Sequence, residues 1–249
     1  GTVEDDRTFG VVGLRIDTQW QGKVFTHRFG AELRRLWADY EYSADVRSEA
    51  GFPLPDSPAT RLNRSQRLNP DGYEASGYWD VRFAPAAAWV VEGGLRVDTQ
   101  TYDGSGDAEQ WGPRLSVLYQ ATPTTRVRAT WGRFYQSQGI NELQVEDGIT
   151  GFHPAQHAVH TIMSIEQKLA QKLDARLELY RKDYGNLSPR FENLLDPPQL
   201  LPELAFDRVR VDADRARAEG VELSFNWRPR SEWSGWFSYS WSRATDRIG

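Results

Sequence analysis

The side chains in this sequence that are best suited to chemistry are three histidines in the stretch HPAQHAVH: His153, His157 and His160. Imidazole nitrogens are common metal ligands, and a spacing of four residues would place His153 and His157 on one face of a helix. The flanking residues favour an extended strand, in which His157 and His160 point to opposite faces because they are three residues apart. We therefore expect a junction between a loop and a strand here, with a metal site as the less favoured alternative.

A second candidate is DGSGD, Asp103 to Asp107, which is rich in oxygen ligands like a calcium loop. It lacks the remaining ligands and the terminal Glu of such a loop, so we expect a plain hairpin connection. The sequence contains no Gly-X-Ser-X-Gly elbow, phosphate loop or dinucleotide fingerprint, and no pair of acidic residues that stands out as acid and base. We predict that the chain is not an enzyme and needs no cofactor, so binding or transport is the expected class of function.

The composition excludes several further classes. The 30 basic and 35 acidic residues give a net charge of −5 with no basic block, which argues against binding to nucleic acid. The absence of cysteine excludes a disulfide scaffold and a thiolate metal site. No apolar run approaches the roughly 18 residues of a membrane-spanning helix. That criterion does not detect barrel strands, which carry only alternating hydrophobicity.

Apolar residues recur at every second position in four stretches: TRVRATWGRFY, KLDARLELYRKDYG, EGVELSFNWRP and SGWFSYSWSRA. Successive side chains of a strand point to opposite faces, so these stretches predict strands with one apolar and one polar face. Helices are expected only as short turns near 140–145 and 198–204. We expect about ten strands, near 8–20, 23–42, 73–83, 88–102, 111–121, 125–136, 157–169, 172–187, 217–227 and 233–246.

The predicted connections alternate in length along the chain. Short turns fall at 21–22, 84–86, 122–124, 170–171 and 229–231, and long polar loops at 43–72, 103–110, 137–156 and 188–216. In an up-and-down sheet successive connections lie at opposite ends, so one end collects the short turns and the other the long loops. Outer-membrane barrels have this anatomy, with short periplasmic turns and long extracellular loops that could capture a ligand.

Two architectures fit these faces: a transmembrane β-barrel with lipid outside and water inside, and a soluble all-β protein that buries the apolar faces in a core. The strict sorting of turns and loops favours the barrel, because Greek-key sandwiches do not sort their connections that way. The residues expected to face lipid are Leu173, Leu177, Leu179, Val221, Leu223, Phe225, Trp227, Phe237, Tyr239 and Trp241. The residues expected to line the lumen are Arg126, Arg128, Arg176, Glu178 and Glu222.

Three stretches resemble the barrel of TonB-dependent outer-membrane receptors, the family that imports siderophores, vitamin B12 and some saccharides. WGPRLSVLYQATPTTRVRATWGRFYQSQGINELQ, 111–144, is similar to a family hairpin with Pro-Arg-Leu and Arg-Ala-X-X-Gly-Arg strands and a loop ending in Asn-Glu-Leu. HTIMSIEQKLAQKLDARLELYRKDYGNLSP, 160–189, resembles the next hairpin, with its Tyr-X-Lys-X-Tyr ending, and RAEGVELSFNWRP, 217–229, resembles the Ala-X-Gly-Val-Glu-Leu strand. They occur in the family's order.

The resemblance implies an antiparallel up-and-down barrel of 22 strands around a plug domain, energised through TonB, in the outer membrane of a Gram-negative bacterium. We expect residues 1–249 to form part of such a barrel, about ten middle strands, without the plug and without the N-terminal and C-terminal barrel strands. The implied function is energised uptake of a scarce extracellular nutrient such as a ferric siderophore. The alternatives are a soluble all-β surface or carbohydrate-binding protein, and an outer-membrane barrel enzyme, for which no nucleophile and base are found.

Overall fold

The computed structural model describes residues 1–48, 60–102, 109–194, 204, 208–228 and 233–248. These residues form strands and one short 3-10 turn, η1 (Val145–Asp147). The strands are β1 (Thr2–Gln21), β2 (Phe25–Ser48), β3 (Thr60–Leu68), β4 (Asp71–Ala86), β5 (Trp89–Gln100), β6 (Gln110–Thr122), β7 (Thr125–Gln136), β8 (Gln156–Ala170), β9 (Leu173–Gly185), β10 (Arg190–Asn193), β11 (Arg208–Val211), β12 (Ala213–Trp227) and β13 (Gly235–Ile248).

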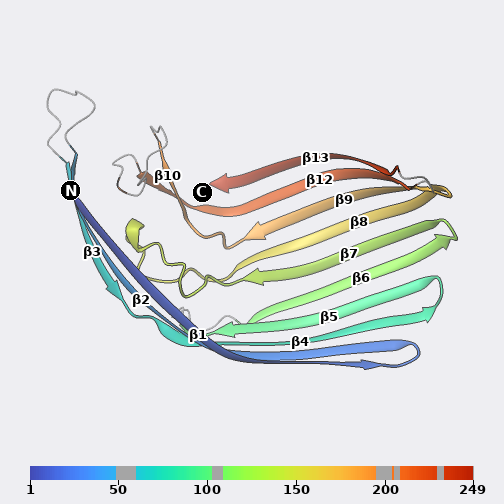
Figure 1. Ribbon diagram of the computed structural model, residues 1–249, viewed down its shortest axis with the longest axis horizontal. Helices are drawn as coiled ribbons and strands as arrows, with labels where there is room; N and C mark the ends of the chain where they lie inside the picture. The colour runs from blue at the N-terminus through green and yellow to red at the C-terminus, as the bar shows by residue number, and fades with distance from the viewer. Residues whose placement is uncertain (49–59, 103–108, 195–203, 205–207, 229–232, 249) are drawn as a thin grey trace.

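One antiparallel sheet carries almost all of these strands, in the order β1-β2-β4-β5-β6-β7-β8-β9-β12-β13, with β3 paired to the far end of β2. The strands β10 and β11 form a separate hairpin. The sheet is strongly curved, and its edge strands β1 and β13 lie nearer the viewer than its middle strands (Figure 1). Among the described residues β1 and β13 each pair on one side only, so the sheet is an open trough rather than a closed barrel.

The expected architecture is confirmed: the fold is all-β and antiparallel, and each of the ten predicted strands is present. Neighbours in the sheet follow one another along the chain, except that β3 comes between β2 and β4 and the β10–β11 hairpin comes between β9 and β12. The tight turns gather at one end of the sheet, here called the turn end, and the long connections gather at the other, the loop end (Figure 1). At the turn end the Gly22 amide donates to the Phe25 carbonyl oxygen at 2.8 Å, which closes the turn between β1 and β2.

The sequence-based expectation was wrong about two of the long loops. Within 43–72, β2 continues to Ser48, β3 occupies Thr60–Leu68, and β4 begins at Asp71. Within 188–216 lie β10, β11 and the start of β12. β3 carries polar residues on both faces, so it lacks the alternation that identified the other strands, whereas β11 does alternate arginine and valine but over only four residues. The short turn expected near 140–145 corresponds to η1, whereas 198–203 and the DGSGD stretch from 103 lie outside the described residues.

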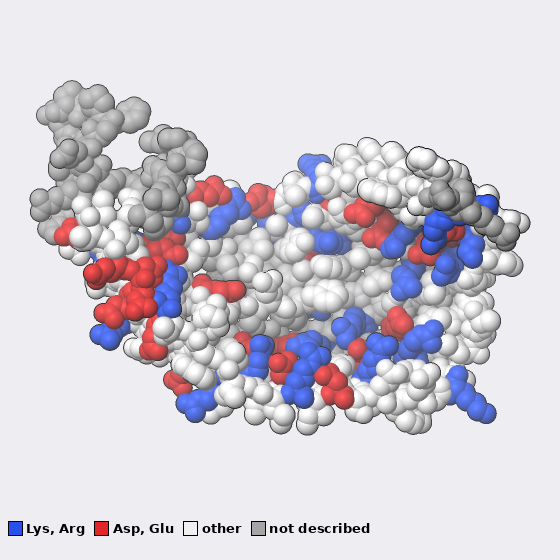
Figure 2. Space-filling view, in the orientation of Figure 1, with Lys and Arg blue, Asp and Glu red and all other residues white. Residues whose placement is uncertain are grey.

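The two faces of the trough differ in chemistry. Figure 2 looks into the concave face, where basic and acidic side chains gather over the middle strands. A hollow of about 880 Å³ near the turn end lies on this face and is lined by Arg126, Glu166 and Arg176. The convex face carries the exposed aromatic and aliphatic side chains, among them Leu14, Trp79 and Trp241. The sheet therefore has no apolar layer packed on its convex side within the described residues.

The buried apolar core lies at the loop end, on the concave side of β2. The segment 137–155 folds inward and packs Ile140, Leu143 and Val145 against Tyr40 and Tyr42. The Tyr40 hydroxyl donates to the Ile140 carbonyl oxygen at 2.7 Å and accepts from the Leu143 amide at 3.2 Å. Burial raises the pKa of Tyr40, so the hydroxyl stays protonated and can serve as that donor at neutral pH.

Ion pairs fasten the same segment to its neighbours. Asp147, whose side chain is only 3% exposed, accepts two hydrogen bonds from Arg208 of β11, one of them at 2.7 Å. Glu146 accepts from Arg7 of β1 at 2.7 Å. A buried carboxylate requires such a partner, since an unpaired charge in this position would cost several kcal/mol. The segment 137–155 is thus held between the β10–β11 hairpin and the first strand.

Replacing Tyr40 by Phe should loosen this segment without disturbing the sheet. The change leaves the Leu143 amide and the Ile140 carbonyl without the bridging hydroxyl, which costs about 1–3 kcal/mol for buried polar groups. Hydrogen exchange of the Leu143 amide should accelerate accordingly in the complete protein. Tyr239→Phe, on the exposed convex face, is the matched control, and equal exchange in both variants would contradict the assignment.

Candidate functional site

The convex face of the sheet is apolar along whole hydrogen-bonded rows. Starting from Trp241 in β13, the register pairs in turn Val221, Leu179, Met163, Ala129, Val117, Val91, Phe83 and Phe25. Residues paired across an antiparallel sheet project from the same face. One row of apolar side chains therefore crosses the sheet from β13 to β2 on the convex side.

Tryptophans mark both limits of this apolar surface. Towards the turn end it finishes at Trp227 in β12, Trp89 in β5 and Trp20 in β1. Towards the loop end it finishes at Trp241 in β13, Trp131 in β7, Trp111 in β6 and Trp37 in β2, beyond which charged or polar residues follow on several strands. Amphipathic aromatic side chains prefer the two interfaces between membrane and water. The convex surface is thus an apolar band between two aromatic lines.

The band crosses the strands obliquely. The tryptophan line towards the loop end, here called the upper line, runs from the row of Trp241 to the row of Trp37 and Gly10. It rises along the strands by roughly twelve residues, or about 40 Å, while it crosses roughly nine strand spacings, or about 43 Å. This gives an angle of about 43°. The tryptophan line towards the turn end, here called the lower line, runs from Trp227 to Trp20. It rises by roughly eight residues over roughly eight strand spacings, which is an angle of about 35° to the hydrogen-bonded rows. Strands of transmembrane barrels tilt by about 35–45°, which would bring both lines level with a membrane plane.

Beyond the upper line the faces exchange character in β1 and β2. On the convex side Trp37 is followed by Asp39 and Glu41, which pair with Thr8 and Asp6 of β1. On the concave side charged Arg34 gives way to Leu36 and Tyr40, which belong to the buried core. A strand that leaves hydrocarbon for water loses its apolar outer face in this way, and its inner face is then free to pack against loops. The exchange places the loop end outside the apolar band.

Aromatic stacking reinforces the turn-end line. Trp20 stacks on His27 with ring centroids 5.3 Å apart, and Phe25 stacks on Phe83 at 4.6 Å. Trp89 and Tyr119 stack at 4.3 Å. Such pairs add roughly 0.5–1.5 kcal/mol each beyond the area they bury. The aromatic side chains therefore form stacked pairs between neighbouring strands.

The structure brings the residues expected to face lipid onto the convex face. Leu177 pairs with Leu223, and Leu223 with Tyr239, so these three share a face with the Trp241 row. Contact with lipid remains a prediction for the set, which also includes Leu173, Leu179, Val221, Phe225, Trp227 and Phe237.

The residues expected to line the lumen project from the opposite, concave face. Glu166 lies between Arg126, at 3.6 Å, and Arg176, at 3.9 Å, and Arg176 also pairs with Glu178. Glu178 and Glu222 are directly opposite in the register, and Arg128 is paired with Ser164. Their contact with a water-filled lumen stays a prediction, as does any contact with a ligand.

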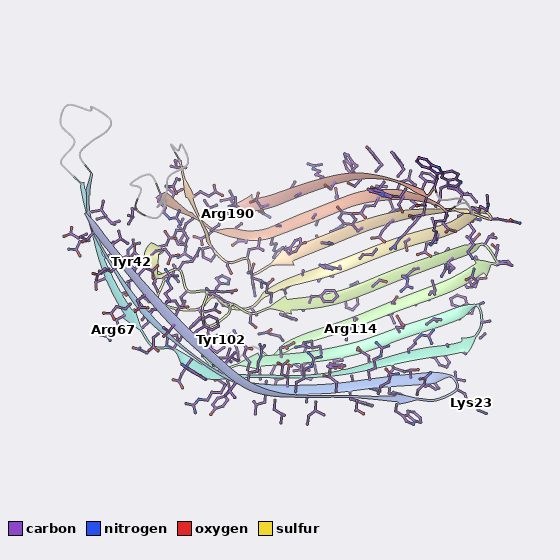
Figure 3. All side chains as sticks on the ribbon, in the orientation of Figure 1. Lys23, Tyr42, Arg67, Tyr102, Arg114 and Arg190 are labelled. Atoms are coloured by element: carbon purple, nitrogen blue, oxygen red, sulfur yellow. The ribbon has the colours of Figure 1, made fainter. Side chains whose placement is uncertain are left out.

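Sequence reasoning missed a second ion pair of the concave face. Arg114 of β6 reaches across β5 and donates two hydrogen bonds to one carboxylate oxygen of Asp80, at 2.6 and 3.0 Å, and a third to the other at 2.7 Å (Figure 3). Gly94 lies between them in the register, and a Cβ there would meet the Asp80 oxygen at 2.1 Å. Any other residue would block this contact, so the GlyGly pair in VVEGGLRV was the available signal.

The structure separates two of the three histidines. His157 projects from the convex face beside Gly185, and His160 from the concave face beside Lys182, as the strand alternation predicts. The described part of the chain contains no cluster of three or more His, Cys, Asp or Glu residues placed to hold a metal ion. The described residues also include no helix long and apolar enough to cross a membrane.

Comparison with known proteins agrees with this geometry. The family described as TonB dependent receptor-like, beta-barrel, matches residues 1–249. The chain belongs to this family. No curated protein sequence matches the chain.

Solved structures of TonB-dependent receptors share its fold. The ferric yersiniabactin uptake receptor FyuA from Yersinia pestis superposes with a TM-score of 0.66 at 15% identity, over 98% of this chain and 37% of that one. The copper transporter OprC gives 0.64 at 11% identity, over 97% and 39%. The outer membrane transporter YddB from Escherichia coli gives 0.63 at 12% identity, over 98% and 34%. The chain spans between a third and two fifths of these receptors.

The oblique band can be tested with two arginines placed in one hydrogen-bonded row. Leu95 in β5 and Thr245 in β13 belong to the same row of the convex face, but Leu95 lies inside the band and Thr245 beyond it. Leu95→Arg should destabilise the membrane-inserted protein by about 2–4 kcal/mol, and Thr245→Arg by at most about 1 kcal/mol. Urea unfolding of the complete receptor in lipid vesicles measures both. Equal costs would show that the band does not follow the tryptophan lines.

Proposed function

We propose that this chain forms part of the wall of an outer-membrane receptor that takes up a scarce nutrient, such as a ferric siderophore, with energy supplied through TonB. The complete receptor would contain further barrel strands and a plug domain within the lumen. Extracellular loops would capture the ligand, and displacement of the plug would open a path along the concave face.

The oblique apolar band is the observation that carries the proposal. Its angles of about 35° and 43° correspond to the strand tilt of a membrane barrel, and a soluble sandwich has no reason to bring two tryptophan lines level with one plane. A soluble sandwich would also cover its apolar faces with a second layer. Here Met163 is 54% exposed in the middle of the sheet and Leu14 is 68% exposed in the edge strand β1, so these side chains need another apolar environment.

The open edges favour a longer barrel. β1 and β13 each present an unpaired row of backbone donors and acceptors among the described residues, and such groups cost several kcal/mol each when they face hydrocarbon. Further strands on both edges would satisfy them and close the wall. The known receptors that share the fold are about two and a half to three times as long, which leaves room for these strands and for a plug.

The concave face supports a polar path. Its ion pairs, such as Arg114 with Asp80 and Arg126 with Glu166, are side by side on neighbouring or next-neighbouring strands and remain partly exposed. A wall of this kind stays hydrated and offers hydrogen-bonding groups to a polar ligand or to a plug. The ferric siderophore is the proposed nutrient because several receptors with this fold are named for one, as is the ferripyoverdine receptor of Pseudomonas aeruginosa.

The direct test is uptake by cells that carry or lack the complete receptor. Deletion of the gene should reduce uptake of a radiolabelled ferric siderophore under iron limitation to background, and the intact gene should restore it. An uncoupler of the inner membrane should abolish the restored uptake, because the energy comes from that membrane. A panel of several ferric siderophores is the appropriate probe.

Two outcomes would overturn the proposal. The first is uptake that persists unchanged in the presence of the uncoupler. The second is a protein that fractionates as a detergent-free monomer in buffer, which would favour the alternative, a soluble all-β surface or carbohydrate-binding protein.

A further inference from the structure

The convex face carries a hollow of about 590 Å³ between the apolar band and the loop end. Arg215 and Arg217 of β12, Arg247 of β13 and His157 of β8 line it. Gly185 forms part of its floor, where a Cβ would meet the His157 ring at 2.6 Å. We propose that this hollow binds the phosphate groups of an anionic lipid in the outer leaflet of the membrane. The inference rests on the proposed function in one respect, that the convex face meets lipid.

The arrangement of two arginines indicates a missing anion. Arg215 and Arg247 stand directly opposite each other in the register of β12 and β13, and neither has an ion-pair partner within the residues that the structure describes. Like charges at directly opposed positions destabilise a sheet. A phosphate between the two guanidinium groups would remove that repulsion, since their fork geometry matches phosphate oxygens.

Two of the acidic residues that line the hollow are already paired with other arginines. Asp183 is shared by Arg181, at 2.8 Å, and Arg217, at 2.7 Å, so one carboxylate serves two arginines. Arg243 lies in the same row as Arg181, with Glu219 between them. Asp246, which also lines the hollow, pairs with Arg190 of β10 at 2.7 Å. The lining contains three arginines and three aspartates, the third being Asp214, and Arg215 and Arg247 are the two arginines of the lining that none of these aspartates neutralises through an ion pair.

The height of the hollow fits a lipid headgroup. On β12 the apolar band spans only Val221 to Trp227, whereas on β1 it spans Gly10 to Trp20, so charged residues begin earlier on the C-terminal strands. Arginines there lie at the boundary between acyl chains and headgroups, and the chains of a bound lipid would lie on the row of Trp241 and Val221.

The opposite edge of the sheet would repel the same lipid. Beyond its band β1 and β2 present Glu4, Asp6, Asp39 and Glu41 on the convex side. Phosphate is therefore expected to bind to one side of the wall, over β9, β12 and β13, and not uniformly around it.

The test measures binding of defined lipids to the complete receptor in detergent micelles by native mass spectrometry. The probes are diphosphoryl lipid A, the same lipid without its phosphates, and inorganic pyrophosphate. Each basic residue near an anionic headgroup strengthens binding by about fivefold, so the double variant Arg215→Gln/Arg247→Gln should bind diphosphoryl lipid A about 30-fold more weakly. Binding of the dephosphorylated lipid should not change.

The matched control is Arg28→Gln/Arg128→Gln, which removes the same charge from the concave face and should leave lipid binding unchanged. The double variant Arg215→Lys/Arg247→Lys should retain part of the affinity for diphosphoryl lipid A, because lysine keeps the positive charge but lacks the forked guanidinium group that matches phosphate oxygens. The unfolding midpoint of the Gln double variant should stay the same or rise, since an opposed like-charge pair is removed.

Three results would overturn the inference: equal affinity of the Gln double variant and the unchanged receptor for diphosphoryl lipid A, equal loss in the concave control, or pyrophosphate binding as tightly as the lipid. None of these three results bears on whether the receptor takes up its nutrient. A receptor that takes up its nutrient without any preference for phosphorylated lipid therefore refutes this site alone, whereas failure to insert into vesicles refutes the proposed function.

Discussion

A backbone surrounded by hydrocarbon must hydrogen-bond every one of its N–H and C=O groups to other backbone groups, and the membrane setting that we propose for this sheet depends on that constraint. An antiparallel ladder from β1 to β13 satisfies the constraint between neighbours, and each row of the ladder then shares one face. Since the strands of a barrel tilt, a level membrane must cut the ladder obliquely. The two tryptophan lines, from Trp227 to Trp20 and from Trp241 to Trp37, follow such a cut.

The same constraint decides how the concave face is built. A polar inner face needs partners at short range, and the ladder supplies them on adjacent strands, as with Arg126 and Glu166, or across a glycine, as with Arg114 and Asp80. Each such pair is partly exposed and contributes modestly to stability. Their combined effect is a polar concave face, whereas the compact apolar core of the described residues lies at the loop end around Tyr40.

Much of this architecture could be predicted from the sequence, because period-two alternation is a local signal. The strand containing Leu173 to Leu179 was identified by it and occupies the predicted position. The extension of β2 to Ser48 was not, since both of its faces are polar or packed beyond the band. The ion pair of Arg114 with Asp80 and the opposition of Arg215 and Arg247 depend on register, which joins residues over thirty positions apart and is set by the assembled sheet.

Spin labels at single introduced cysteines test the central claim most directly, because the chain contains no cysteine of its own. Labels would replace Ala31 and Asp39 on β2, Leu177 on β9 and Arg217 on β12, in the complete receptor in lipid vesicles. Collision rates would be measured for oxygen and for a water-soluble nickel chelate. We predict that collisions with oxygen dominate at Ala31 and Leu177, and that collisions with the chelate dominate at Asp39 and Arg217. This pattern is expected although the hydrogen-bonded row of Ala31 lies nearer the loop end than the row of Arg217. Equal access of the chelate to Ala31 and Asp39 would contradict the account.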